Sequence, residues 1–217
     1  MSLETEDWSP VVDVPASFQS LAARLSRVLG AAMVATLDAA VSTCLEELGN
    51  FTVVDVAFVT LVDDDDRVSD DWHWIRAGRQ AVAPDIGSPL AATFGSATEF
   101  LRLGHTVAVS DLLEIDLAPS ERALATANGL RSIVMAPVLV DSHLLGLVGL
   151  QIFDHAHTWD SATLSHLEVV AQLLVQAVTR SRDRERRKLA RSPIGIREFA
   201  DHDLGQPERR PARRSHR

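Results

Sequence analysis

Residues 129–153, GLRSIVMAPVLVDSHLLGLVGLQIF, decide the fold because they are typical of two strands joined by a short turn. The predicted strands cover 131–140 and 144–153, with the turn at Asp141, Ser142 and His143. A sheet with one face in water would alternate apolar and polar side chains. The first strand instead has apolar residues at both parities: Ile133, Met135 and Leu139 at odd positions, and Val134, Ala136, Val138 and Val140 at even ones. Both faces should therefore be covered, the second either by protein or by a bound molecule.

The hairpin is expected near the end of an α+β domain that begins with helices. Hydrophobic periodicity and turn residues predict helices over 17–29 and 33–49, strands over 53–62 and 72–78, a short helix near 90–102, a short strand over 106–111, a helix over 119–127, the hairpin, and a long helix from 160 to about 190. The predicted fold class is an antiparallel sheet with the terminal helices on one face and the insert 79–127 on the other.

Four residues give more local expectations. Gly30 and Gly49 should end the first two helices, because glycine commonly follows a helix. Pro137 has no backbone donor, so we expect it at a bulge or at an unpaired position of its strand. Asp160 should cap the last helix.

Charge divides the chain into an acidic body and a basic tail. The net charge is −9, yet residues 180–217 contain 13 Lys or Arg against 6 Asp or Glu. We expect a flexible N-terminus over 1–16, one domain over 17–180, and a basic helical extension with a disordered tail over 181–217. The body should repel nucleic acid and anionic membranes, so only the tail could attract either.

The sequence contains no membrane-spanning run, no export signal and only one cysteine, and these features bear on the cellular location and on disulfide or metal chemistry. No apolar run approaches the ~18 residues of a membrane span. The acidic N-terminus has no apolar core of an export signal, so we expect a cytoplasmic protein that does not bind membranes. Cys44 is the only cysteine, which excludes an intrachain disulfide, a Cys-x-x-Cys pair and a multi-cysteine metal site.

Motifs for catalysis and metal binding give no positive signal, so we predict no catalytic residue and no metal ligand. The sequence contains no Gly-x-Ser-x-Gly, phosphate-binding loop or His-Glu-x-x-His motif. A calcium loop starting at Asp63 would need glycine and glutamate where Val68 and Trp74 stand, so the acidic run 63–66 is interpreted as a solvated hairpin tip. Two alternatives stay open: a metal held by His155 and His157, and haem ligation by His73.

The predicted order of helices and strands, together with several short motifs, resembles a GAF domain over about residues 33–180. The resemblance is carried by residues 129–132 (GLRS) leading into 135–138 (MAPV), by 145–150 (LGLVGL) after the turn, by Trp159 and the apolar helix that follows, and by 54–58 (VDVAF) with Trp74 and Gly78. It is closest to the GAF subtype found ahead of diguanylate cyclase or histidine kinase domains. The resemblance implies a sensory domain with a cavity roofed by the middle insert.

The resemblance raises three possible chemistries, namely bilin attachment, methionine sulfoxide reduction and cyclic-nucleotide binding, and the sequence lacks the residues for each. A bilin-attaching cysteine would need a pocket position, whereas Cys44 is expected on an apolar helix stripe. Methionine sulfoxide reductase activity of the GAF type needs several cysteines. The residue set that resembles cyclic-nucleotide sites is also missing, so the ligand and any cofactor are unknown from the sequence.

Seven residues are predicted to line the cavity and bind an unidentified small molecule: Trp74, Phe94, Phe100, Asp111, Ser132, Met135 and Gln151. The aromatic residues could stack on a flat ligand, and the polar residues could orient it. Gly146 and Gly149 would allow a neighbouring element or a ligand to approach closely. The alternative is a cavity filled by its own side chains in a domain that serves as a dimerisation scaffold.

The last helix is predicted to form a homodimer seam. Its apolar residues follow the 3-4-3-4 spacing of a coiled coil: Leu164, Leu167, Ala171, Leu174 and Val178. In similar signalling proteins such a helix leads to an output domain, but about 25 residues remain here, too few for an independent core. We therefore predict a non-catalytic sensing module that acts as a dimer on a separate output protein. In the alternative function, residues 180–217 dock on nucleic acid or an acidic partner.

Overall fold

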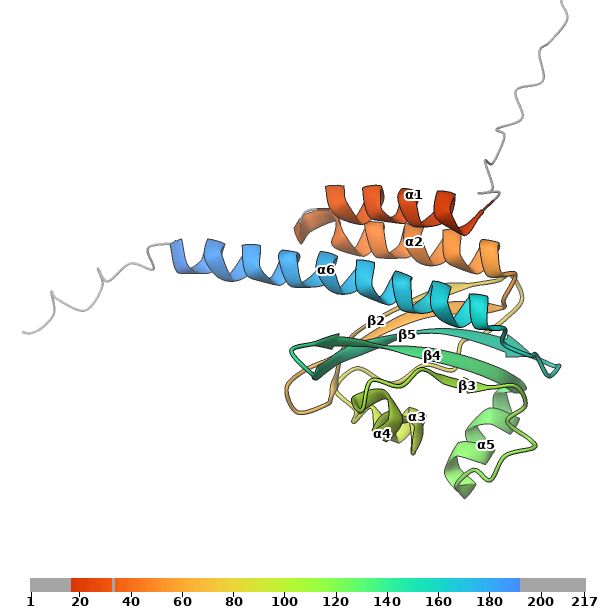
Figure 1. Ribbon diagram of the computed structural model, residues 1–217. Coiled ribbons are helices and arrows are strands. Elements are labelled where there is room, and N and C mark those ends of the chain that lie inside the picture. The colour runs from red at the N-terminus through yellow and green to blue at the C-terminus, as the bar shows by residue number, and fades with distance from the viewer. Residues whose placement is uncertain (1–16, 33, 192–217) are drawn as a thin grey trace, which may run out of the picture.

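The chain folds as an antiparallel sheet with helices on both faces (Figure 1). The structure, a computed structural model, describes residues 17–32 and 34–191. One face is covered by α2 (Leu37–Thr52) and α6 (Ser161–Arg191), with α1 (Phe18–Ala31) packed on the outer side of these two helices and the short helix η1 (Val34–Thr36) before α2. The other face carries α3 (Ala91–Phe94), α4 (Ala97–Arg102) and α5 (Pro119–Asn128). The predicted α+β class, with terminal helices opposite the insert, is confirmed.

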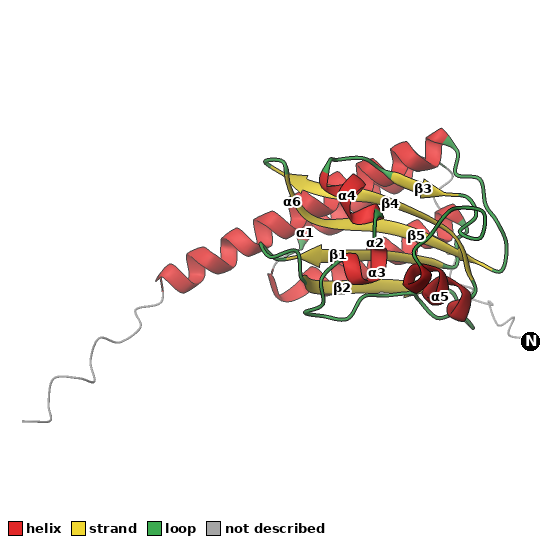
Figure 2. Cartoon of the chain, turned by 90° about the horizontal axis from the view of Figure 1, so that it is seen from below, coloured by secondary structure: helices red, strands yellow, loops and turns green. Residues whose placement is uncertain are grey.

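The sheet in the described residues has five strands in the order β2-β1-β5-β4-β3, and every neighbouring pair is antiparallel (Figure 2). The strands are β1 (Val56–Val62), β2 (Val68–Ile75), β3 (Val107–Val109), β4 (Leu130–Val140) and β5 (His143–Phe153). The long hairpin β4–β5 joins through Asp141 and Ser142, whose φ angles of 48° and 64° are those of a two-residue turn that suits the twist of a hairpin. The stretch that predicted the fold thus occupies the centre of the sheet.

Each face of the hairpin packs in a core of its own. Val134, Ala136 and Val138 of β4 belong to the core under the helical layer. Ile133 and Met135, from the same strand, belong to the core on the insert side. Successive side chains of a strand point to opposite faces, so a strand between two cores is apolar at both parities.

Several predicted boundaries are wrong for local reasons. Gly30 and Gly49 lie inside α1 and α2, and α2 ends instead at Val53 in the left-handed region. The second strand is β2, Val68–Ile75, rather than residues 72–78. The helix predicted near 90–102 is divided into α3 and α4 at Gly95, whose φ is 49°.

Two other local expectations are resolved differently. Asp160 caps α6 as predicted, because its Oδ1 accepts a hydrogen bond of 2.7 Å from the backbone N–H of Thr163. Pro137 does not lie at a bulge. It stays in register with Leu147, and the irregularity follows between Val138 and Leu139. The pairing of β3 with β4 ends at Met135, so Pro137 lies beyond the end of the neighbouring strand.

The stripe predicted as a dimer seam is used within the single chain. Leu167, Ala171, Leu174 and Val178 are only 1–2% exposed, and Leu164 packs against the same core. These side chains lie where α6 packs on β4 and α1. The prediction that they form a free seam is therefore wrong, because a helix buried on one side and a coiled-coil helix share the same spacing.

Some predictions concern residues at the two ends of the chain. The predicted flexible segment 1–16 and most of the predicted basic tail, 192–217, lie outside the described residues. The described start of that tail, 181–191, continues α6 without a break, as predicted. None of the described helices is long and apolar enough to cross a membrane.

Candidate ligand-binding cavity

A cavity of about 230 Å³ lies between the sheet and the insert. Its floor is the insert-side face of β3 and β4, and its walls come from α3, α4, α5 and the segment before α5. Representative lining residues are Ile133 and Met135 from the sheet, Phe94 and Phe100 from the α3–α4 segment, and Leu124 and Ala125 from α5. The insert therefore supplies the roof of a hollow, as the sequence predicted.

The cavity walls are tied together by one carboxylate. Glu121 Oε1 accepts a hydrogen bond from the backbone N–H of Ser96 at 3.0 Å, and its Oε2 accepts one from the N–H of Ala118 at 2.8 Å. These two amides stand just before α4 and α5, so Glu121 joins the starts of both helices. Gly95 makes room for this contact, because a Cβ there would stand 1.3 Å from Glu121 Oε1.

Aromatic packing closes the cavity toward the middle of the sheet. The ring of Phe94 stacks on that of Phe58 from β1, with centroids 5.9 Å apart and planes 11° from parallel. Phe58 fits because Gly149 of β5 has no side chain: a Cβ there would lie 2.3 Å from the Phe58 Cζ atom. The close approach expected at Gly149 is thus made by a neighbouring ring of the protein itself.

Three of the seven predicted site residues line the cavity. Phe94 and Met135 are buried in its wall and floor, whereas Phe100 is 54% exposed and stands where the cavity meets solvent. Phe94 and Phe100 come from the insert and Met135 comes from the hairpin, the two segments that the sequence predicts on opposite sides of the cavity.

Trp74 and Ser132 were placed on the wrong face of the sheet. Trp74 packs against the core under the helices, with its ring against Gly49 of α2. The Ser132 hydroxyl is fully buried and donates a hydrogen bond of 2.8 Å to the carbonyl oxygen of Val109. Side chains alternate between the faces of a strand, so Ser132 and Met135, three residues apart in β4, cannot both line the cavity.

Asp111 and Gln151 have protein partners. Arg131 and the backbone N–H of Leu113 donate to Asp111, and these bonds, the Arg131 bond first, hold the pKa of Asp111 below its usual range. The fully buried amide of Gln151 donates to the carbonyl oxygen of Val82 at 2.7 Å and accepts from its N–H at 3.1 Å. Gln151 therefore fixes the start of the insert, and neither side chain is free to orient a ligand as predicted.

The sequence missed much of the cavity wall. Leu112, Ile115 and Leu117 come from the segment before α5, and Leu124 and Ala125 come from α5 itself. For the first three, the available signal is the recurrence of apolar residues in DLLEIDLAP, 111–119. The contact between Glu121 and Ser96 gave no local signal, because the two residues lie 25 positions apart in the chain.

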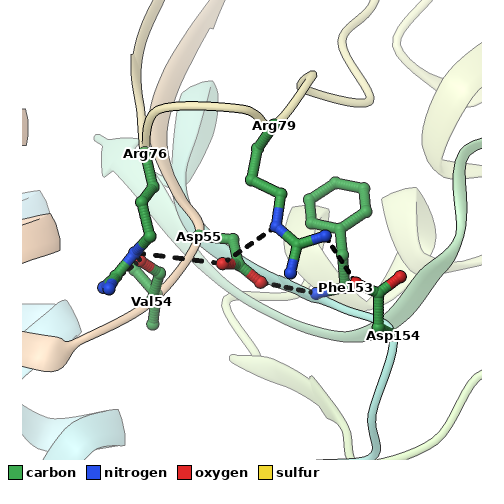
Figure 3. Close-up of polar contacts among 6 residues, drawn as sticks. All are labelled: Val54, Asp55, Arg76, Arg79, Phe153 and Asp154. Atoms are coloured by element: carbon green, nitrogen blue, oxygen red, sulfur yellow. Dashed lines mark hydrogen bonds and ion pairs between the residues drawn. The ribbon is translucent and has the colours of Figure 1, made fainter.

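A polar cluster where β1 begins and β5 ends fastens the start of the insert to the sheet (Figure 3). Asp55 Oδ2 accepts from the backbone N–H of Phe153 at 2.9 Å, and Asp55 Oδ1 lies 3.4 Å from Arg79 Nε. Arg79 also donates to Asp154 at 2.5 Å, and Arg76 donates to the carbonyl oxygen of Val54. Both guanidinium groups bond to protein oxygens, so the cluster acts as a structural clamp.

The histidines considered as metal or haem ligands have protein neighbours. His73 Nε2 lies 3.1 Å from Asp71 Oδ2, and its ring stacks on Phe58. Burial lowers the pKa of His73 and raises that of Asp71. The His157 ring packs edge-on against Trp159. Among the residues that the structure describes, no three His, Cys, Asp or Glu side chains gather in a way that could hold a metal ion.

Cys44 lies on the far side of the sheet from the cavity. It is buried in α2 among the residues of the helical core. Burial, with a smaller contribution from Glu47, raises the pKa of its thiol to about 12. The thiol is therefore neutral at ordinary pH and cannot reach the cavity.

Comparisons with known proteins agree with this architecture. The sequence profile of the GAF domain family matches residues 34–179. The methanogenesis regulatory histidine kinase FilI of Methanothrix harundinacea (strain 6Ac) is 28% identical over 158 residues, which are 68% of this chain but only 17% of the kinase. The chain thus spans about a sixth of the length of that relative.

Solved structures show the same fold at low sequence identity. The phycoerythrobilin-bound GAF domain of a cyanobacterial phytochrome has a TM-score of 0.63 and 16% identity, covering 78% of this chain and 98% of that one. Free methionine-R-sulfoxide reductase from Neisseria meningitidis, in complex with its substrate, has a TM-score of 0.58 and 17% identity, covering 77% and 91%. A bilin-binding domain and an enzyme therefore share this fold.

Proposed function

Because the chain belongs to the GAF domain family, we propose that it is a non-catalytic sensory domain whose ligand occupies the cavity under β4. Domains of this family are generally sensory or regulatory and bind small molecules. The ligand would be sensed through the sheet, and the response would leave through α6.

The double-sided packing of β4 carries this proposal. Met135 lines the cavity, whereas Val134 and Ala136, its neighbours in the strand, pack in the core that α6 covers. A ligand that shifts Met135 therefore acts on a strand directly beneath α6. Packed interiors respond to such shifts as connected units, since they contain few voids that could absorb them.

The form of α6 supports its role as the output element. Its described length is 31 residues, and its C-terminal end runs on beyond the edge of the sheet (Figure 1). The kinase relative has the matching segment as a small part of a much longer regulatory protein. We propose that α6 transmits to an output partner, either a separate protein or another domain.

The position of Cys44 favours binding without chemistry. It is the only cysteine of the chain, and the structure buries it opposite the cavity. Covalent bilin attachment or cysteine-based reduction in this cavity would need a thiol within it. We therefore propose that this domain neither attaches a bilin, as the phytochrome domain binds one, nor reduces methionine sulfoxide.

A homodimer stays part of the proposal, with its seam moved to the outer side of α6. Val169 on that side is 42% exposed, unlike the buried stripe. A dimer joined there would leave the core of each protomer intact. Light scattering of the purified chain tests this, since a monomeric mass at high micromolar concentration would rule it out.

The basic tail is less supported as a docking segment. In the part of the chain that the structure describes, Arg182 lies 3.6 Å from Asp70, and Arg180 and Arg184 donate to backbone oxygens at the end of α1. These arginines therefore serve to hold α6 against the body. The other basic residues of 192–217 lie outside the described residues, so docking on nucleic acid stays a prediction from charge alone.

Ligand binding and transmission are tested together on the full chain. Thermal unfolding is measured with small neutral aromatics, nucleotides and tetrapyrroles, and hydrogen exchange is then followed by mass spectrometry with the tightest binder. We expect a raised melting temperature, slower exchange in α5 and β4, and altered exchange in α6. A bound ligand that leaves α6 unchanged would contradict the sensory role, and a panel without any binder would contradict the cavity as a ligand site.

A further inference from the structure

From the chemistry of the cavity, we infer that its ligand is a neutral, mostly apolar molecule of about one aromatic ring that carries a hydrogen-bond donor. This inference rests on the proposed function and narrows it to one ligand class. Three properties of the site carry it: the volume, the lack of a free cation among the described residues that line it, and the acceptor oxygens of Glu121.

The volume sets the size of the ligand. A cavity of about 230 Å³ equals the space of about eight water molecules at ~30 Å³ each. An apolar cavity of about 150 Å³ is large enough for benzene. The present cavity therefore accepts a substituted single ring or a small fused ring such as indole, whereas a nucleotide or a linear tetrapyrrole would extend through its mouth into solvent.

The lining excludes anions. Only Thr93, Ser96 and Glu121 bring polar side chains to it, and the remaining lining residues are apolar. A carboxylate or phosphate would lose its water without gaining a cation, and it would stand close to the carboxylate of Glu121. The described arginines on neighbouring segments are engaged, since Arg131 pairs with Asp111 and Arg122 donates to the carbonyl oxygen of Ile115.

Glu121 offers the polar handle. Each of its oxygens already accepts one backbone N–H. A carboxylate has about four acceptor sites, so about two remain, and one of these can accept a hydrogen bond from an indole N–H or a phenol O–H. An ammonium ligand would also meet this carboxylate, but it would bring its strongly hydrated charge into apolar walls, which disfavours it relative to a neutral donor.

The mouth of the cavity is apolar, like most of its interior. Phe100 and Ile115 both line the cavity and are exposed, by 54% and 39%. An apolar rim admits an apolar ligand without stripping water from charged side chains on the way. The entrance and the interior therefore select for the same class.

Four probes of similar size test the inference on the full chain: indole, p-cresol, benzoate and benzylamine. Calorimetric titration and thermal shifts are compared for the wild type, for Ala125→Leu, which fills the cavity, and for Ala127→Leu, an exposed control on the same helix. Leu117→Trp fills the cavity from another segment, in case Ala125→Leu does not fold. We expect indole and p-cresol to bind roughly tenfold or more tightly than the charged probes, with binding lost in the filled variants and kept in the control.

The outcomes separate this inference from the proposed function. Equal or tighter binding of benzoate or benzylamine, lost in the filled variants, overturns the neutral ligand class but leaves a sensory cavity. Binding of the neutral probes that survives in a folded filled variant places them elsewhere and overturns the inference. If no probe binds, and nucleotides and tetrapyrroles also fail, the proposed function fails with it.

Discussion

The indole ring of Trp74 lies against the backbone of α2 at Gly49, so closely that a Cβ on residue 49 would stand 2.1 Å from the Cε3 atom of the ring. Trp74 comes from β2, and its contact anchors the edge of the sheet to the helical layer. Gly49 is needed for this packing, which explains a glycine in the interior of a helix where it lowers helix propensity.

Replacement of Gly49 by alanine should therefore destabilise the protein. The new methyl group must displace the Trp74 ring, and overpacking of this kind costs about 1–3 kcal/mol in the free energy of unfolding. Urea unfolding followed by tryptophan fluorescence measures the effect. Gly30→Ala in α1 is the matched control, since no atom lies within 4 Å of a Cβ there. It should be neutral or stabilising by up to about 1 kcal/mol, and equal effects of the two substitutions would contradict the packing argument.

The same pair shows how far the sequence could predict the structure. The apolar hairpin identified two covered faces, because that property depends only on residue type along one strand. It did not locate Trp74 and Ser132 correctly, because the face of each β2 side chain is set by pairing with β1, and Ser132, three residues from Met135, must point away from the face that Met135 occupies. A shift of one residue reverses the face of every side chain that follows.

Long-range partners set the second limit. Glu121 looks like an ordinary surface acid in the first turn of α5, and only the fold brings Ser96 to it. Leu167 and Leu174 have a spacing that suits both a buried helix and a coiled coil, and the decision between them comes from β4 and α1. The contact of Glu121 and the packing of Leu167 and Leu174 thus depend on partners distant in sequence, which the local pattern does not reveal.

The role of Glu121 as a tie between the cavity walls predicts the effect of its removal. Glu121→Ala leaves the N–H groups of Ser96 and Ala118 without their acceptor, and the loss of such a cap costs about 0.5–2 kcal/mol. Hydrogen exchange should become faster at the starts of α4 and α5, and the affinity for a cavity ligand should fall. Glu99→Ala, which removes an exposed carboxylate of the same insert, is the control. Unchanged exchange in Glu121→Ala would disprove the tie.

The cap of α6 predicts a pH-dependent contribution to stability. The N–H of Thr163, and to a smaller extent its hydroxyl, lowers the pKa of Asp160 below its ordinary value of 3.8. The folded state therefore prefers the ionised form, so the contribution is present above the unfolded pKa and is lost as the pH falls through the folded pKa.

Thermal unfolding of the wild type and Asp160→Ala checks this sign. The wild type should melt at the higher temperature at pH 5–7, and the difference should shrink as the pH falls below about 3.8. Asp116→Ala, which removes an exposed carboxylate in the segment before α5, should show a smaller difference. A gap between wild type and Asp160→Ala that grows toward low pH would be the wrong sign for a cap.

The buried thiol of Cys44 predicts slow chemistry. Its pKa of about 12 keeps it neutral, and the helical core shields it. A thiol reagent at pH 8 should therefore leave the native chain unlabelled and react at once in concentrated urea. Ser42→Cys, at an exposed position of the same helix, should label in the native state. Immediate single labelling of the native wild type would contradict the buried position.

The opposite faces of β4 should separate ligand binding from transmission. Met135→Ala enlarges the cavity and costs about 2–4 kcal/mol in the free energy of unfolding. It should let a larger ring, such as naphthalene, bind more tightly than it binds the wild type. Val134→Ala removes two methyl groups from the core under α6 at a cost of about 1–3 kcal/mol. This variant should bind indole with wild-type affinity, yet the ligand-induced change of hydrogen exchange in α6 should be smaller. If Val134→Ala loses binding and keeps the α6 response per bound ligand, β4 does not divide the two roles in this way.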